Sequence, residues 1–326
     1  MGIESQLERK LEVMVKKSAQ QATATGKKFA VALSGGSDSG LIAALTKTKY
    51  AITVKLPYGK RYDEFRDACR TVKHLGIKTH IVVHLKDEEF DKVMRKAVPI
   101  IGRVTGHFSL FPLYKMYERL AEEDFDCLIF GDGPDESMCG YIRCILMDYI
   151  YNAPQNLPAF KYYQPLFDKV LPSPWEVYAR AIDKDPQKVR RLMEGEPLLK
   201  GMCKVEMTLT RADFGGINNA LAAHFGITFK SPYTEPKLDR FMFNLPPEMK
   251  IKDYWGKYLL RKVAVKYLPQ EIVWRRQKIG GPVYPVNLKK RWLEKGEFNK
   301  EKYCEYQRKI LEKISKPALL NPSNLN

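Results

Sequence analysis

The feature of this chain that most constrains its fold is a series of four short apolar runs, each followed by a stretch with helical periodicity. The runs lie at residues 29–33, 51–56, 79–83 and 127–130. Strands that alternate with helices form parallel sheets covered by helices on both faces, because each crossover helix packs back onto the sheet. We therefore predict an α/β fold with a doubly wound parallel sheet over residues 25–150.

The segments on either side of this region have different patterns. Residues 1–24 predict an amphipathic helix, with apolar side chains on one side and charges opposite. Residues 151–200 contain seven prolines, which interrupt long helices. Helical periodicity returns at residues 203–226, 234–245, 255–268 and 286–315. We expect residues 151–326 to form a largely helical lobe packed on the sheet domain.

The first apolar run leads directly into the motif SGGSDS at residues 34–39. Its glycines let backbone N–H groups approach phosphate oxygens, its hydroxyls add donors, and a helix is expected to begin just beyond. Asp38 would repel a phosphate unless a cation lay between them, which indicates Mg²⁺. A glycine-rich turn that only caps a helix is the alternative, which the complete hexamer and its context disfavour. The motif also lacks the Gly-Lys pair of a kinase-type phosphate loop.

A second motif, GDGPDE at residues 131–136, follows the fourth apolar run. The carboxyl ends of parallel strands open at one edge of a sheet, where ligands bind. Asp135 is therefore expected to reach the same cation as Asp38. Standing alone, the segment would be interpreted as a surface turn with a helix cap. Its pairing with the first motif favours a metal site.

Basic residues gather in a third region. Lys257 and Arg261 are followed by the segment RRQKIGGP at residues 275–282, which contains Lys278. Cations beside a Gly-Gly-Pro loop suit a closing site that neutralises a leaving pyrophosphate. When such a cluster stands alone, the commoner interpretation is a basic surface exposed to solvent.

Together, the segments LSGGSDS, TVKLP, LIFGDGPDESMCGY and GKYLLRKVAVKYLPQEIVWRRQKIGGP resemble the synthetase domain of the asparagine synthetase family, over roughly residues 25 to 290. The pattern SGGxDS marks the wider superfamily of ATP pyrophosphatases, or PP-loop enzymes. The resemblance implies an adenine nucleotide alpha hydrolase-like fold with a parallel sheet of the five-stranded type. It also implies a reaction: a substrate carboxylate attacks ATP, pyrophosphate leaves, and ammonia or an amine displaces AMP from the acyl-adenylate.

The same resemblance implies roles for individual residues. Mg²⁺ would be held by Asp38 and Asp135, and the backbones of Leu33, Val54 and Gly131 would grip the nucleoside. The residues that would cradle pyrophosphate are Ser34, Gly35, Gly36, Asp38 and Ser39. Lys278 and Lys257 would neutralise charge during adenylation and amide formation.

The chain departs from the family pattern at the acyl acceptor end. Asp132 stands where the family has a Glu that acts on the acceptor, so we assign Asp132 a catalytic role. The stretch that usually carries Thr-x-Arg for the substrate amino acid reads VTGHFS at residues 104–109. A bidentate Arg clamp is hard to replace, so aspartate is disfavoured as the substrate. His107, Phe108 and Tyr141 are the candidate pocket residues, although core packing is the commoner fate of aromatic side chains.

The nitrogen donor is also expected to differ from that of the glutamine-using members. Glutamine-using members begin with a glutaminase domain and a nucleophilic cysteine at residue two, where this chain has Gly2. We therefore expect free ammonia, an amine, or ammonia delivered by a separate glutaminase subunit. The acceptor is expected to be a small-molecule carboxylate, and a homodimer is left open.

Charge keeps two other hypotheses open. The chain carries 55 Lys and Arg against 38 Asp and Glu, a net charge of +17 that attracts polyanions. One alternative is a PP-loop enzyme that adenylates a base in RNA or DNA, although no nucleic-acid-binding module is evident and this reading is not favoured. The other is a non-catalytic nucleotide-binding subunit of a glutaminase complex.

The cellular compartment can be predicted from features that the sequence lacks. No apolar run approaches the ~20 residues that span a bilayer, and the N-terminal residues lack the apolar core of a secretory signal. The six cysteines include no CxxC pair, which favours reduced thiols over a zinc site. These features predict a cytoplasmic protein without membrane partners.

Overall fold

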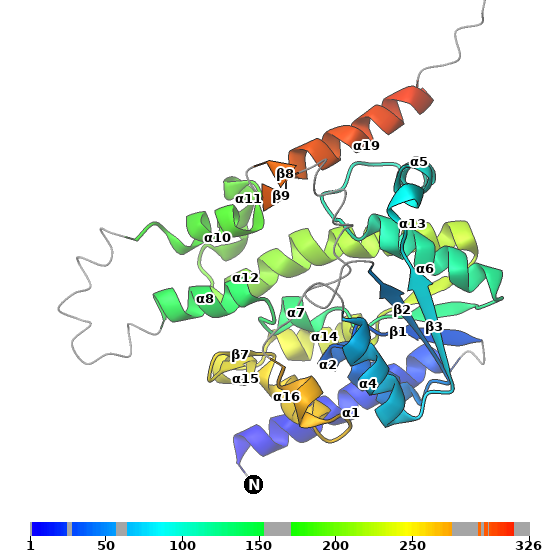
Figure 1. The fold of residues 1–326 in the computed structure, drawn as a ribbon. Coiled ribbons are helices and arrows are strands. Elements are labelled where there is room, and N and C mark those ends of the chain that lie inside the picture. The colour runs from blue at the N-terminus through cyan, green and yellow to red at the C-terminus, as the bar shows by residue number, and fades with distance from the viewer. Residues whose placement is uncertain are drawn as a thin grey trace, which may run out of the picture.

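The structure is a computed structural model that describes most of the chain (Figure 1). Described are residues 2–24, 28–56, 64–152, 171–275 and 300–315, and the backbone of residues 293–294 and 297–298. Among these residues, no helix combines the length and the apolar character needed to cross a membrane.

The centre of the fold is a five-stranded sheet in which every neighbouring pair is parallel. Its strands are β1 (Phe29–Ala32), β2 (Tyr50–Lys55), β3 (Thr79–His84), β4 (Cys127–Ile129) and β5 (Thr228–Lys230). The order β3-β2-β1-β4-β5 confirms the predicted doubly wound parallel sheet. The chain winds outward in both directions from β1 and β4, so the crevice above these two strands is the expected ligand site.

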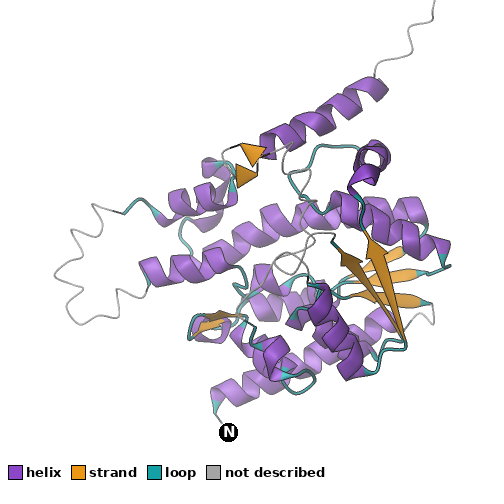
Figure 2. Ribbon diagram, viewed as in Figure 1, coloured by secondary structure: helices purple, strands orange, loops and turns teal. Residues whose placement is uncertain are grey.

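Alternate residues of each central strand feed two separate cores. In β1, Ala30 and Ala32 join one core, while Val31 joins the other, followed by Leu33. The helices of the first core are α5 (Phe90–Ile101), α6 (Leu110–Glu122), α13 (Ala212–Phe225) and α19 (Lys300–Ser315). Those of the second are α1 (Ile3–Thr23), α2 (Ser37–Thr46), α4 (Phe65–Leu75), α14 (Pro236–Phe243), α15 (Pro247–Lys250), α16 (Tyr258–Ala264) and α17 (Gln270–Val273). Figure 2 shows the sheet enclosed by helices, which explains why the strand sequences are apolar without alternation.

A third core lies outside the sheet and holds the short helices of the second half together. Its helices are α8 (Ile142–Tyr151), α10 (Pro174–Ile182), α11 (Pro186–Met193) and α12 (Leu198–Val205). Of these, α10 and α11 lie wholly within residues 151–200, where the prolines were expected to interrupt long helices. A π-helical segment, η3 (Glu206–Arg211), joins α12 to α13 in one long rod (Figure 1).

Two predicted helices are wrong at their N-terminal ends. Residues 255–268 begin with strand β7 (Trp255–Gly256), which pairs with β6 (Ile251–Lys252), and the helix starts only at Tyr258. In the segment 286–315, strands β8 (Leu293–Glu294) and β9 (Glu297–Phe298) pair with each other before α19. The remaining short elements are η1 (Asp87–Glu89), α7 (Pro134–Ser137) and η4 (Pro232–Thr234).

A series of ion pairs, which we call the ionic ladder, links α1 to α16 and to Lys266 just after it. Lys262 lies 2.5 Å from Glu4 and 3.2 Å from Glu8, and Lys266 lies 2.8 Å from Glu8 and 2.7 Å from Glu12. The opposite side of α1 is buried in the second core through Leu11, Val15 and Ala19. The ladder therefore holds the N-terminal helix against the segment that carries Lys257.

Acid is expected to loosen this ladder. Hydrogen bonding to Lys262 lowers the pKa of Glu4 from 4.5 to about 2. Burial raises the pKa of Glu8, but bonds to Lys266 and Lys262 outweigh burial and lower it. Carboxylates with depressed folded pKa values stabilise the fold above their unfolded pKa, and that contribution is lost as the pH falls through the folded pKa. We expect the double variant Glu4→Gln/Glu8→Gln to melt about 2–4 °C lower at pH 7, since exposed pairs contribute about 0.3–1 kcal/mol each.

Thermal melting between about pH 7 and pH 2.5 measures this effect. The double variant should lose less of its melting temperature below about pH 5 than the unsubstituted chain, because two of the titrating groups are gone. Glu122→Gln, which removes a carboxylate 3.8 Å from Arg119, is the control. Equal acid losses in the double variant and the unsubstituted chain would contradict the assignment.

Candidate functional site

The SGGSDS turn (residues 34–39) is shaped by a glycine that no other residue could replace. Gly35 has a φ of +75°, and a Cβ there would lie 2.8 Å from Glu64 O and Ala68 N. Ser34 Oγ and Ser39 Oγ are 3.1 Å apart, and Ser39 Oγ also accepts from the Ser34 N–H. The turn thus leads from β1 into α2, whose helix begins at Ser37.

The second motif packs directly against this turn. A Cβ on Gly131 would lie 2.5 Å from Ser39 N, so the end of β4 touches the first turn of α2. Tyr233 is fully buried and donates its hydroxyl to Asp38 O at 3.2 Å. The two motifs, distant in sequence, therefore meet above the β1–β4 crevice as predicted from the parallel sheet.

A single buried ammonium joins the two predicted metal ligands. Lys257 Nζ lies 2.5 Å from Asp38 Oδ2 and 2.7 Å from Asp135 Oδ1, and Lys257 is 1% exposed. We call these three side chains the Lys257 bridge. A Cβ on Gly140 would overlap the Asp135 carboxylate and the Lys257 stem, so glycine is required beside it. The structure thus places Asp38, Asp135 and Lys257 together.

The donor set fits Mg²⁺ completed by phosphate oxygens. Both carboxylates already converge on one cation, the Lys257 ammonium. Across the described residues, no group of three or more His, Cys, Asp and Glu gathers that could hold a metal alone. Mg²⁺ commonly takes one or two carboxylates and completes its shell with water and substrate phosphates. Arg261 adds positive charge: burial lowers its pKa, while Asp38 and Asp135 oppose that shift.

The residues predicted to grip the nucleoside lie at the same edge of the sheet. The Leu33 N–H donates to Ile52 O at 2.9 Å, and Leu33 O accepts from Thr53 Oγ1 at 2.9 Å. Val54 pairs with Val83 in the β2–β3 register. Their contacts with a nucleoside stay a prediction. Lys278 and the Gly-Gly-Pro loop lie outside the described residues.

Two of the predicted pocket residues belong to the loop between α5 and α6. The His107 N–H donates to Thr105 Oγ1 at 3.0 Å, and Thr105 Oγ1 donates to Asp213 Oδ2 at 2.9 Å. Burial lowers the pKa of His107, and Asp213 partly opposes this. Phe108 packs on the ring of Tyr303 with centroids 5.0 Å apart. The Tyr303 hydroxyl also donates to His107 O at 3.4 Å, so these contacts of His107 are with its own loop and α19 and not with the Lys257 bridge.

Tyr141, the third pocket residue, packs against a polar network that the sequence analysis did not predict. Its hydroxyl donates to Glu136, and the Arg143 guanidinium lies 3.7 Å from the centre of its ring. Arg143 forms a bidentate pair with Glu206 at 2.6 and 2.7 Å, and the Tyr178 hydroxyl donates to Glu206 at 2.5 Å. We call Arg143, Glu206 and Tyr178 the Glu206 network.

Asp132 lies beside the same crevice. Its backbone oxygen accepts from Ser231 Oγ at 2.7 Å. Burial raises the pKa of Tyr117, and the negative charge of Asp132 raises it further. The predicted catalytic role of Asp132 is not tested by these contacts.

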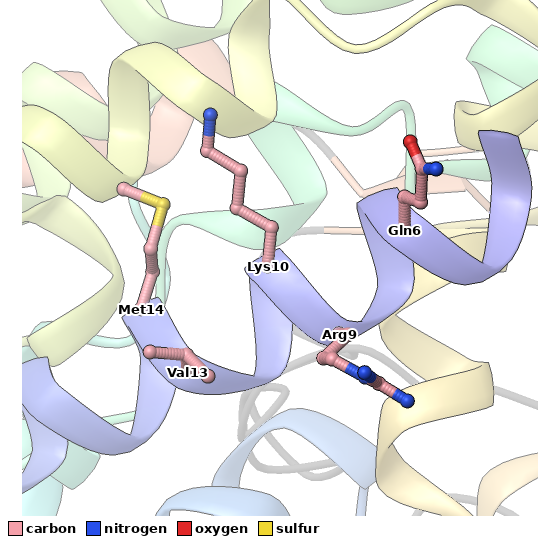
Figure 3. A pocket seen from close by; sticks show the side chains of 5 residues that line it. All are labelled: Gln6, Arg9, Lys10, Val13 and Met14. Atoms are coloured by element: carbon pink, nitrogen blue, oxygen red, sulfur yellow. The ribbon is translucent and has the colours of Figure 1, made fainter. Parts of the chain in front are cut away.

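One surface hollow lies away from this site, on α1 (Figure 3). Its lining consists of Gln6, Arg9, Lys10, Val13 and Met14. Lys10 lies 5.0 Å from the ring centre of Phe241. The lining contains no carboxylate, nucleophile or glycine turn, so this hollow offers no chemistry of the kind found at the Lys257 bridge.

Comparison with known proteins identifies similar chains. The family model described as "Asparagine synthase" matches residues 10–316. The asparagine synthetase [glutamine-hydrolyzing] of Gallus gallus is 24% identical over 295 residues, covering 87% of this chain and 44% of that protein. Asparagine synthetase B [glutamine-hydrolyzing] of Escherichia coli is 23% identical over 273 residues, covering 77% of this chain and 40% of that protein. The chain therefore spans less than half the length of these relatives.

Solved structures give a weaker likeness. The U34-tRNA thiolase NcsA from Methanococcus maripaludis is 16% identical, with a TM-score of 0.32, covering 93% of this chain and 80% of that one. The NMN synthetase from Francisella tularensis is 14% identical, with a TM-score of 0.29, covering 70% of this chain and 98% of that one. At these TM-scores neither likeness bears on substrate.

Proposed function

Because the chain belongs to the asparagine synthase family, we propose that it is an ATP-dependent amide ligase that adenylates a carboxylate, releases pyrophosphate, and transfers ammonia or an amine to the acyl group. The observation that carries the proposal is the convergence of the SGGSDS turn, Asp38 and Asp135 on one cation above the β1–β4 crevice. A reaction that crowds anions together needs this kind of preorganised positive charge.

Each part of the site has a defined task in this proposal. The turn offers backbone N–H groups and the hydroxyls of Ser34 and Ser39 to the departing pyrophosphate. Asp38 and Asp135 would hold Mg²⁺, which would neutralise charge on the phosphates. Lys257, whose ammonium lies beside Asp38, would supply a further positive charge to the phosphates. Lys278 is proposed for the same purpose from its sequence position.

The acceptor is proposed to be a small carboxylate other than aspartate. The loop between α5 and α6 presents His107 where the family pattern has the substrate-binding Arg, and burial lowers the pKa of that imidazole. An imidazole that stays neutral at pH 7 lacks the charge and the fork geometry of a guanidinium. The nitrogen is proposed to come as ammonia, as an amine, or from a separate glutaminase.

Exchange of labelled pyrophosphate into ATP tests the proposal. The chain is incubated with ATP, Mg²⁺ and one candidate carboxylate at a time, beginning with aspartate. We expect exchange that depends on one carboxylate other than aspartate, since label enters ATP only when adenylation reverses. Exchange with aspartate would restore the family's usual substrate and overturn our proposal for the acceptor.

A nucleic acid substrate is the second candidate, favoured by the net charge of +17. Transfer RNA and single-stranded DNA are therefore included in the panel, with retention measured at two salt concentrations. Exchange driven only by nucleic acid, with retention that falls steeply with salt, would replace the amide ligase by a base-modifying enzyme. If no carboxylate and no nucleic acid supports pyrophosphate exchange, a non-catalytic nucleotide-binding subunit would be favoured.

A further inference from the structure

The Lys257 ammonium occupies the place that the two carboxylates would offer to a metal ion. Its distances to Asp38 Oδ2 and Asp135 Oδ1 are 2.5 and 2.7 Å. The Lys257 side chain is 2% exposed, whereas those of Asp38 and Asp135 are 13% and 16% exposed. The two carboxylate side chains are thus partly exposed, while the lysine side chain between them is almost fully covered by its neighbours.

The backbone aims this side chain at the carboxylates. Lys257 has a φ of +56°, a left-handed conformation that is uncommon for residues other than glycine. The Lys257 N–H donates to Met138 O at 3.1 Å, and Lys257 O accepts from the Arg261 N–H at 2.9 Å. A Cβ on Gly140 would lie 2.8 Å from Lys257 Cδ and Cε, so the stem is confined as well. Residues other than glycine in this conformation are found more often at active sites and ligand-binding positions than elsewhere.

Two ionised carboxylates that lie this close together repel each other unless a cation lies between them. The ammonium removes that repulsion in the nucleotide-free chain. It also repels a divalent cation that approaches the same oxygens, because like charges repel each other more strongly in a partly buried site than in water.

We infer that Lys257 is an internal counter-ion that keeps Asp38 and Asp135 assembled in the free chain and opposes binding of a divalent cation until a nucleotide supplies phosphate oxygens to its ammonium. This rests on the proposed function, since it assumes the same metal and nucleotide site. The ammonium then pairs with phosphate, and the two carboxylates become available to the metal. Metal affinity is therefore linked to nucleotide binding through one lysine.

Binding of Mn²⁺, followed by the electron paramagnetic resonance signal of the free ion, tests the inference without any turnover. Titrations are run on the metal-free chain and on Lys257→Met, each with and without α,β-methylene ATP. Methionine keeps an unbranched stem and removes the charge. Without nucleotide, Lys257→Met should bind Mn²⁺ at least about tenfold more tightly than the unsubstituted chain. The gain that nucleotide adds should shrink correspondingly.

A second buried lysine provides the matched control. Lys250 is 2% exposed, and its ammonium donates to Phe243 O at 2.6 Å instead of bridging carboxylates. Lys250→Met should leave Mn²⁺ affinity unchanged. If Lys257→Met does not fold by circular dichroism, Lys257→Gln, which is polar but uncharged, takes its place with the same expected gain.

The outcomes separate this inference from the proposed function. If the unsubstituted chain binds Mn²⁺ with nucleotide, but the uncharged variant binds it no more tightly without nucleotide, the counter-ion role is wrong and the metal site stands. If the unsubstituted chain binds no Mn²⁺ even with α,β-methylene ATP, the metal and nucleotide site itself is wrong.

Discussion

Replacing Asp38 by Asn is expected to reduce carboxylate-dependent ATP–pyrophosphate exchange by about 10³-fold, equivalent to about 4 kcal/mol of transition-state stabilisation. The substitution keeps the shape of the side chain but removes one of the two charges that converge on Lys257. An amide oxygen is a poorer ligand for Mg²⁺ than a carboxylate, so charge on the departing pyrophosphate is less well neutralised. The measurement is the initial exchange rate at saturating ATP and carboxylate.

The control for this variant has the same burial and an equivalent ion pair. The side chain of Asp239 is 13% exposed, as is that of Asp38, and its carboxylate lies 2.8 Å from the Arg211 guanidinium. Asp239→Asn should therefore retain exchange within about twofold, while any loss of stability from a missing ion pair is common to both variants. Exchange by Asp38→Asn within about tenfold of the unsubstituted rate would exclude Asp38 from the reaction.

The sequence predicted the central strands because their burial leaves a direct mark on composition. Residues of β1 that face opposite cores are both apolar, which produces the uninterrupted run at residues 29–33. Strand β5 escaped prediction for the opposite reason. Its three residues, Thr-Phe-Lys, are half-buried or exposed and leave no apolar run. Pairing with β4, and not its own sequence, makes it a strand.

The meeting of Asp38 and Asp135 was predictable for a topological reason. Each follows a parallel strand, and β1 and β4 are neighbours in the sheet, so their carboxyl ends open into one crevice. The position of Lys257 was not predictable in this way. A helix over residues 255–268 would have placed it on a regular surface, whereas the structure has a left-handed residue after a short strand. Because lysine rarely adopts a left-handed backbone conformation, its presence in the sequence does not predict one.

The Glu206 network was invisible in the sequence because its members are far apart. Arg143 and Tyr178 lie 63 and 28 residues before Glu206. A glutamate inside a helix ordinarily faces solvent, and the one available signal was its position in the otherwise apolar stretch around Cys203 and Val205. The π-helical segment that begins at Glu206 also has no signature in the residue pattern, although such segments are frequent at functional sites.

Replacing Glu206 by Gln is expected to lower the free energy of unfolding by about 3–5 kcal/mol, because it leaves a largely buried guanidinium without its counter-charge. Glu206 is 0% exposed and accepts both Arg143 bonds as well as the Tyr178 hydroxyl. Burial alone would lower the pKa of Arg143, but the hydrogen bonds to Glu206 raise it above its ordinary value. The guanidinium therefore stays charged, and an amide cannot neutralise it.

Urea unfolding followed by circular dichroism measures the loss, and a double-variant cycle identifies its cause. If the cost comes from an uncompensated charge, Glu206→Met together with Arg143→Met should be less destabilising than Glu206→Met alone, because an apolar pair leaves no buried ion behind. If the cost came from lost packing, the two effects would add. A loss below about 1 kcal/mol for Glu206→Gln would mean that water solvates Arg143 in place of the carboxylate, and that the network contributes little to the stability of the fold.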